Sequence, residues 1–169
     1  MFHHFSEDPT IERFVPHVPA TNPTHAPAVW AIDTQHAPLY WFPRDCPRVA
    51  VWPTTDEQRP GFAEAFTTSA PRVHAMEAHW LARMRDVRLF RYDLPDHLFT
   101  PWEQATGQWV ATEPVVPLTV TPAGDLLDLH AESGIELRIV PSLWPIHDLV
   151  LPGPWEFSIV RISFARPRA

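Results

Sequence analysis

Proline is the feature of this sequence that most limits what it can fold into. The chain has 21 prolines among 169 residues, about 12%, against a usual share of roughly 5%. They are spread between apolar runs, and each one fixes φ and removes an amide donor. We therefore expect short helices and strands joined by ordered, proline-rich connections.

The apolar content is high enough for a packed core. Hydrophobic residues make up 45% of the chain and include 8 Trp and 10 Phe. One compact domain is the default at this length, so we predict a single domain over residues 1–169. Expected strands outnumber helices, and no long crossover helix recurs after the strands. The pattern favours an α+β fold with a mixed, mostly antiparallel sheet and short helices.

The positions of the elements follow from apolar patterning and from cap and breaker residues. We expect strands over residues 1–6, 29–33, 48–52, 87–92, 109–120 (one or two), 135–140 and 157–164. Short helices are expected over residues 6–14, 34–41, 55–66, 125–132 and 144–150. The longest helix is expected from Val73 to Met84, because apolar residues recur there at three- and four-residue spacing.

Charge and cysteine content restrict the partners and the compartment. The net charge of −7 lacks the basic character of a general nucleic-acid binder. The single cysteine, Cys46, cannot form an internal disulfide and suits a reducing compartment. The start has no basic region leading into an apolar one, and no stretch reaches the roughly twenty apolar residues of a membrane span. We predict a cytoplasmic protein without a membrane partner.

Several common catalytic motifs are missing from the sequence. It has no Gly-x-Ser-x-Gly elbow and no glycine-rich phosphate loop, which disfavours ATP and Rossmann-type dinucleotide binding. His74 and His79 are five residues apart and cannot share a helix face, so we predict no metal site. Cys46 has two interpretations: a nucleophile activated by the flanking Arg44 and Arg48, or an incidental buried thiol.

Four segments resemble a known but uncharacterised family. They are residues 2–7 (FHHFSE), 29–33 (VWAID), 36–48 (HAPLYWFPRDCPR) and 134–138 (GIELR). They are similar to a family of short bacterial proteins, a domain of unknown function, and the likeness extends over nearly the whole chain. That family brings no established activity.

A more distant resemblance implies a function. The opening strand ends in His-Phe-Ser, a later strand leads into an Ala-x-x-Tyr helix, and a Trp-Val-x-x-x-Pro-Val-x-Pro strand pair follows. This order of parts is similar to ADP-ribosyltransferase-like folds, which have a split sheet. The resemblance implies a His that hydrogen-bonds the NAD ribose, a Tyr that stacks on nicotinamide, and a Glu that stabilises an oxocarbenium-like transition state.

Carried onto this sequence, the resemblance assigns the His to His4, with Ser6 beside it, and the aromatic to Tyr40. The Glu should fall near Gln108 and Trp109, where no acid stands. Gln108 can hold a ribose hydroxyl but cannot supply negative charge. Glu113 is the nearest acid, and its register is wrong for the same role on a regular strand.

Two functional hypotheses follow. The first is a nucleotide or NAD-like ligand, with ADP-ribosyl transfer or NAD hydrolysis if the protein is an enzyme, in a cleft around His4 and Tyr40. The second is a non-catalytic binding or interaction module that keeps the fold and lacks the acid. The first requires the His4 imidazole and the Tyr40 phenol to lie on the same side of the sheet, with Arg44 or Arg48 binding phosphate. The candidate ligand-binding residues are His4, Ser6, Tyr40, Arg44, Arg48, Gln108 and Trp109.

Overall fold

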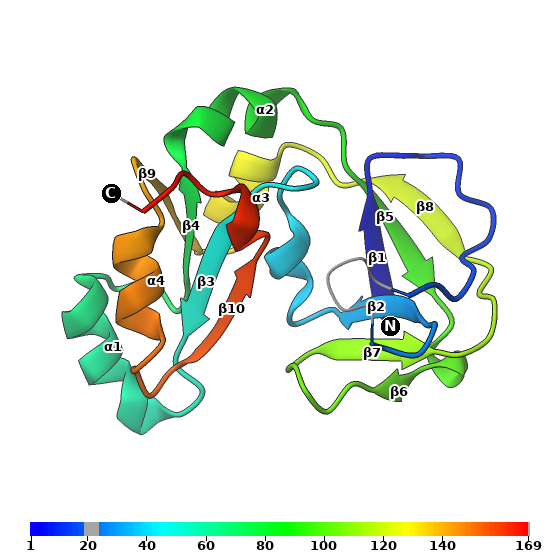
Figure 1. Ribbon diagram of the computed structural model, residues 1–169, viewed down its shortest axis with the longest axis horizontal. Helices are drawn as coiled ribbons and strands as arrows, with labels where there is room; N and C mark the ends of the chain where they lie inside the picture. The colour runs from blue at the N-terminus through cyan, green and yellow to red at the C-terminus, as the bar shows by residue number, and fades with distance from the viewer. Residues whose placement is uncertain (19–23, 169) are drawn as a thin grey trace. The chain divides into compact units, whose positions relative to one another are not determined.

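The computed structural model describes residues 1–18 and 24–168, and the chain divides into two compact units (Figure 1). Unit 1 comprises Met1–Trp41 and Arg88–Ala123, and unit 2 comprises Phe42–Val87 and Gly124–Ala169. Each unit has its own sheet and its own apolar core. Each is assembled from two separate stretches of the chain, and a single domain over residues 1–169 stays a prediction.

In the described part of unit 1, six antiparallel strands form one sheet in the order β6-β7-β2-β1-β5-β8. Two 3-10 helices belong to the same unit, η1 (Ala37–Tyr40) after β2 and η4 (Asp96–Leu98) after β5. The strands are β1 (Phe2–Ser6), β2 (Val29–Asp33), β5 (Phe90–Leu94), β6 (Thr100–Pro101), β7 (Gln108–Ala111) and β8 (Thr119–Pro122).

Strand alternation puts the side chains of the unit 1 sheet on two faces, and one of these faces covers the core. His4 pairs with Tyr92, so its side chain lies on the face that covers the core. His3 pairs with Ile32 on one side and with Asp93 on the other, so all three share the opposite face. The core residues of unit 1 are Val29, Ala31, Tyr92, Leu94, Phe99, Ala111 and Val115.

Unit 2 has a sheet in the order β10-β3-β4-β9, in which β4 and β9 run parallel and the other pairs antiparallel. Helices α1 and α4 cover one face of this sheet, where Phe62, Phe66, Ile146 and Val150 are buried against it (Figure 1). The strands are β3 (Arg48–Trp52), β4 (Val73–Glu77), β9 (Glu136–Val140) and β10 (Glu156–Val160). The helices are η2 (Asp56–Gln58), α1 (Arg59–Phe66), η3 (Ala78–Trp80), α2 (Leu81–Asp86), α3 (Leu126–Glu132), α4 (Trp144–Val150) and η5 (Ile162–Phe164).

The structure confirms the α+β class, with mixed, mostly antiparallel sheets and four short α-helices among the described residues. The strands predicted over 29–33 and 48–52 have those bounds. Helix α3 begins as predicted, because the Asp125 carboxylate accepts hydrogen bonds from the amides of Leu127 and Asp128. It is followed by Gly134 at φ 66°, a left-handed conformation that suits glycine after a helix. No helix in the described part of the chain has the length and apolar character of a membrane span.

The helix predicted from Val73 to Met84 is wrong. The chain forms the strand β4 over Val73–Glu77, followed by η3 and α2. Every residue of β4 is buried, because the strand is hydrogen-bonded on both edges and packed on both faces. A strand buried on both faces has no alternation of polar and apolar residues. Its apolar residues therefore matched the spacing expected for one face of a helix.

Three other predicted elements differ from those in the structure. No helix forms over residues 6–14: Ser6 Oγ and Asp8 Oδ1 instead accept the amides of Asp8 and Thr10 and make a turn. The strand expected over 87–92 begins at Phe90. The strand expected over 157–164 ends before Arg161, whose φ of 55° breaks the extended backbone.

Candidate functional site

Unit 1 contains a small pocket on the sheet face that carries His3. Its volume is about 60 Å³, which leaves room for a few water molecules. Strands β1, β2 and β7 and helix η1 supply its walls. The lining residues are His3, His4, Phe5, Trp30, Ala31, Ile32, Tyr40 and Gln108.

Tyr40 and Gln108 meet at this pocket although they are 68 residues apart in the chain. The Gln108 side-chain amide donates a hydrogen bond to Tyr40 Oη over 2.8 Å. The ring of Phe5 lies parallel to that of Tyr40, with a centroid distance of 6.4 Å and an interplanar angle of 6°. Two aromatic faces and one amide from three separate elements therefore border the same space.

The turn between β2 and η1 determines where Tyr40 lies. Asp33 Oδ1 accepts the backbone amide of His36 and also contacts His36 Nδ1, both at 2.8 Å. The His36 ring lies against Gly107, where a Cβ would meet it at 2.4 Å. Gly107 also has a φ of 77°, so glycine is required there both for space and for backbone conformation. This packing links the start of β7 to the turn that carries η1.

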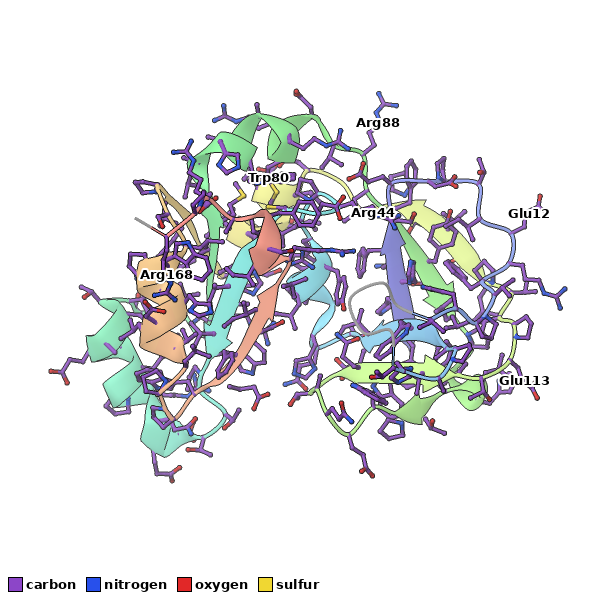
Figure 2. The ribbon with its side chains drawn as sticks, in the orientation of Figure 1. Glu12, Arg44, Trp80, Arg88, Glu113 and Arg168 are labelled. Atoms are coloured by element: carbon purple, nitrogen blue, oxygen red, sulfur yellow. The ribbon has the colours of Figure 1, made fainter. Side chains whose placement is uncertain are left out.

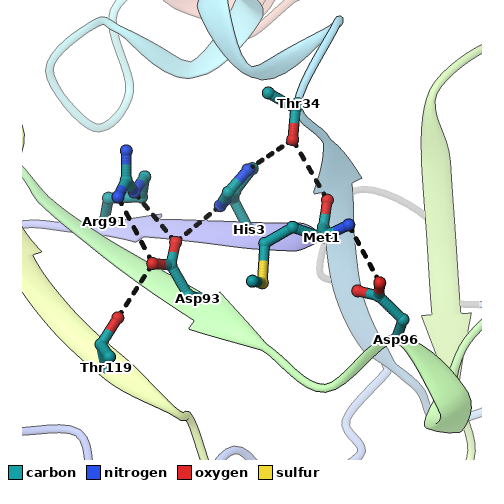
Figure 3. A network of polar contacts seen from close by, with 7 residues as sticks. All are labelled: Met1, His3, Thr34, Arg91, Asp93, Asp96 and Thr119. Carbon is teal, nitrogen blue, oxygen red and sulfur yellow. Dashed lines mark hydrogen bonds and ion pairs between the residues drawn. The ribbon is translucent and has the colours of Figure 1, made fainter.

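His3 is buried and hydrogen-bonded at both ring nitrogens (Figure 3). Its Nδ1 lies 2.8 Å from Asp93 Oδ1, and its Nε2 lies 2.9 Å from Thr34 Oγ1. Asp93 also binds Arg91 at 2.9 Å and the Thr119 hydroxyl at 2.9 Å. Burial acts to raise the pKa of Asp93, but hydrogen bonds from Thr119, His3 and Arg91 outweigh it and lower the pKa below its ordinary value. Asp93 is therefore a carboxylate held from several sides.

His4 borders the pocket, but its ring lies on the opposite face of the sheet from Tyr40. Its ring centroid is 4.7 Å from that of Phe14 on the core side, and its Nδ1 lies 3.1 Å from the Trp30 carbonyl oxygen. A hollow shared by the His4 imidazole and the Tyr40 phenol is therefore not formed. The imidazole on the Tyr40 face is that of His3, one residue earlier, because successive strand side chains point to opposite faces.

The other candidates lie in different surroundings. Ser6 Oγ accepts the amide of Asp8 at the end of β1. Trp109 stacks on Phe2 with a centroid distance of 4.3 Å, on the core face and thus opposite Gln108. Among the predicted ligand-binding residues, the side chains of Tyr40 and Gln108 are hydrogen-bonded to each other.

The two arginine candidates belong to unit 2. Arg44, labelled in Figure 2, and Arg48 follow the boundary at Phe42. Arg48 is buried, donates to the Cys46 carbonyl oxygen at 3.1 Å and lies over the Phe42 ring at 5.3 Å. These contacts give Arg48 a local structural role within unit 2.

Cys46 does not have the surroundings of a nucleophile. Its side chain is fully buried, and burial raises the pKa of the thiol to about 12, although Arg48 acts in the opposite direction. A thiol in that state is protonated at neutral pH and closed to a substrate. The structure favours the buried-thiol interpretation. Among the described residues, no three His, Cys, Asp or Glu side chains are grouped so that they could hold a metal ion.

A family model, described as a family of unknown function (DUF6886), matches residues 3–165. The chain belongs to this family. The match confirms the first resemblance, to a domain of unknown function. No curated protein and no solved structure matches the chain. The family description states no activity, so functional proposals for this DUF6886 protein depend on the geometry of its pocket and its polar network.

Proposed function

We propose that the unit 1 pocket binds the flat ring of a small nucleotide-like or NAD-like molecule and that the protein acts as a binding module. One observation carries the proposal: the rings of Phe5 and Tyr40 and the amide of Gln108 border one pocket. The proposal replaces His4 by His3 in the predicted site, because His3 shares the pocket face.

The chemistry of these side chains suits a planar, polar ring. Aromatic faces stack on nucleobases and nicotinamide, and such stacking tolerates different rings. A primary amide has two N–H donors and one acceptor oxygen, and the bond to Tyr40 uses one donor. Gln108 can therefore also pair with a carboxamide or with the edge of a base.

The size of the pocket limits which part of the ligand can enter. Its volume of about 60 Å³ lies below the roughly 300 Å³ at which pockets that enclose drug-sized ligands begin. We propose that only the ring enters, and that the ribose and phosphates of a nucleotide stay outside. Mononucleotides are therefore the ligands of choice for a first test.

A binding role fits this pocket better than ADP-ribosyl transfer does. The described residues that line the pocket include no Asp or Glu, and Gln108 stands where the ADP-ribosyltransferase-like resemblance calls for the acid. Glu113 is exposed in the loop after β7 (Figure 2). Positive charge on a ribose in the transition state requires a carboxylate that is already in place. The resemblance supports an NAD-like ligand, and the lone cysteine supports a cytoplasmic place of action.

A thermal-shift titration with nicotinamide mononucleotide, AMP, NAD and ADP-ribose tests the proposal. A ligand at a hundred times its Kd stabilises the folded chain by about 2.7 kcal/mol, or roughly 5 to 10 °C in Tm for a protein of this size. We expect such a shift with at least one mononucleotide, and we expect Gln108→Leu to abolish it. Gln104→Leu is the matched control, because Gln104 is exposed in the loop before β7.

Two results would contradict the proposal. One is the absence of a shift with every ligand in the wild-type protein. The other is an equal shift in Gln108→Leu. Release of free nicotinamide from NAD by the wild-type protein would replace the binding role with a catalytic one.

A further inference from the structure

Asp93, His3 and Thr34 form a continuous carboxylate–imidazole–hydroxyl chain in unit 1 (Figure 3). The two contacts that build it measure 2.8 Å and 2.9 Å, although Asp93 is 90 residues and Thr34 is 31 residues from His3. A hydroxyl within hydrogen-bond reach of a base, with the base oriented by a third group, is the arrangement of an activated nucleophile.

The hydroxyl is the exposed member of this chain of side chains, as access of a substrate requires. His3 is 5% exposed, and the Asp93 side chain is 14% exposed. Thr34 is exposed, at the turn where β2 ends. The acid and the base are thus shielded from water, while the hydroxyl can be reached by a substrate.

The protonation of His3 follows from its partners. A carboxylate can only accept, so His3 Nδ1 carries the proton that faces Asp93. In the neutral ring, Nε2 then presents its lone pair to Thr34 Oγ1, and the Thr34 hydroxyl can donate to it. The carbonyl oxygen of Met1, 3.3 Å from Thr34 Oγ1, is the more distant alternative acceptor.

The pocket lies beside this chain of side chains. His3 belongs to both, and Ile32 of the pocket wall lies in β2, two residues before Thr34 in the chain. Phe5, Trp30 and Ile32 make this wall largely apolar. Such a wall suits an apolar or aromatic acyl group.

We propose that Thr34 is an acyl-accepting nucleophile for small carboxylic esters, with His3 as its general base and Asp93 as the residue that positions His3. The Thr34 oxygen attacks the ester carbonyl carbon while its proton moves to His3 Nε2. The tetrahedral intermediate collapses, the bond to the leaving alcohol breaks, and that oxygen takes the proton from Nε2. Water then attacks the acyl-threonine by the same route, giving the carboxylic acid and the free hydroxyl.

The test is acylation of the whole protein by p-nitrophenyl acetate and by a fluorophosphonate probe. We expect a burst of one equivalent of p-nitrophenolate and one acetyl group on the protein, which peptide mapping assigns to Thr34. Thr34→Val should abolish the label, and Thr34→Ser should keep it. His3→Gln should slow acylation about 100-fold or more, since a general base contributes typically 10²- to 10⁴-fold. Asp93→Asn should slow it similarly and alter its pH profile.

Thr119→Val controls for a purely structural network. Thr119 also donates to Asp93, at 2.9 Å, but lies outside the proposed proton path, so this variant should be acylated much faster than Asp93→Asn. The proposal is overturned if neither reagent labels the wild-type protein, if the label lies elsewhere, or if Thr34→Val reacts as fast as wild type. This readout is independent of the nucleotide titration, because it follows a covalent acetyl group on Thr34 and not the binding of a nucleotide.

Discussion

A buried histidine pair makes unit 2 sensitive to acid. His130 Nδ1 donates to the Leu126 carbonyl oxygen at 2.6 Å, so its Nε2 is left as an acceptor. His74 Nδ1 lies 3.1 Å from that Nε2 and must carry the proton between them. His74 Nε2 is then a buried lone pair, and it has no hydrogen-bond partner among the described residues. Both rings are neutral in this arrangement.

The surroundings of His74 keep it neutral in the folded chain. Burial lowers the pKa of His74 well below 6.5, and the nearby His130, Arg72 and Arg48 lower it further. Burial also lowers the pKa of His130. Below pH 6.5 residue 74 binds a proton in the unfolded chain and stays neutral in the folded chain. The free energy of unfolding therefore falls as the pH falls.

The size of this loss of stability follows from the linkage between proton binding and folding. A histidine that is neutral when folded and titrates near pH 6.5 when unfolded contributes a loss of about 1.4 kcal/mol between pH 7.5 and 5.5. His74→Leu should remove that part of the pH dependence. At pH 7.5 the variant should be less stable than wild type by about 1 to 3 kcal/mol, because His130 Nε2 loses its donor.

Urea unfolding of the wild-type protein and of His74→Leu at pH 7.5, 6.5 and 5.5 measures the effect. The difference between the two free energies of unfolding should shrink by about 1.4 kcal/mol across this range. Titrating groups that do not contact His74 behave alike in both proteins and cancel in the difference. The same pH dependence in both proteins would refute the reasoning, since it would mean that residue 74 takes up its proton equally in the folded and unfolded chain.

Two further predictions concern Gly107 and Cys46. Gly107→Ala should destabilise the protein by about 2 kcal/mol or more, because the new Cβ would meet the His36 ring at 2.4 Å and φ is 77°; chemical denaturation measures this, and wild-type stability would contradict it. Iodoacetamide should label Cys46 in the native protein far more slowly than a free thiol at neutral pH, because the thiol is buried with a pKa of about 12. Labelling at the rate of a free thiol would contradict the buried placement, and labelling in urea serves as the control.

The elements that could be predicted from the sequence are those with local signals. The strand over 48–52 is a β-branched run ended by Pro53, and it forms as predicted. Helix α3 has an acidic cap at Asp125 and a glycine at 134, and both function as expected. Such signals act between neighbours in the chain, so they do not depend on the tertiary structure.

The strand β4 shows why other elements could not be predicted. Its residues from Val73 to Glu77 include helix formers, and their spacing matches a helix face. The strand forms because β3 and β9 pair with its two edges, and β9 begins 63 residues after the start of β4. No local pattern in the sequence indicates that pairing.

The candidate site was partly predictable for the same reason. The order of parts predicts Tyr40 and Gln108, and their side chains meet. The choice between His3 and His4 depended on the strand register, where a shift of one residue reverses the face. Asp93 and Thr34 could not be predicted, because they belong to no sequence motif. They contact His3 only once the sheet has folded.

We propose that the pocket on the His3 face of unit 1, bordered by Tyr40 and Gln108, binds a ligand. NMR titration with nicotinamide mononucleotide tests it most directly, by following the side-chain amide signals of Gln108 and Gln104 in the same sample. We expect saturable shifts of the Gln108 amide and none of the Gln104 amide. An unchanged Gln108 amide at millimolar ligand, or equal shifts of both amides, would contradict it.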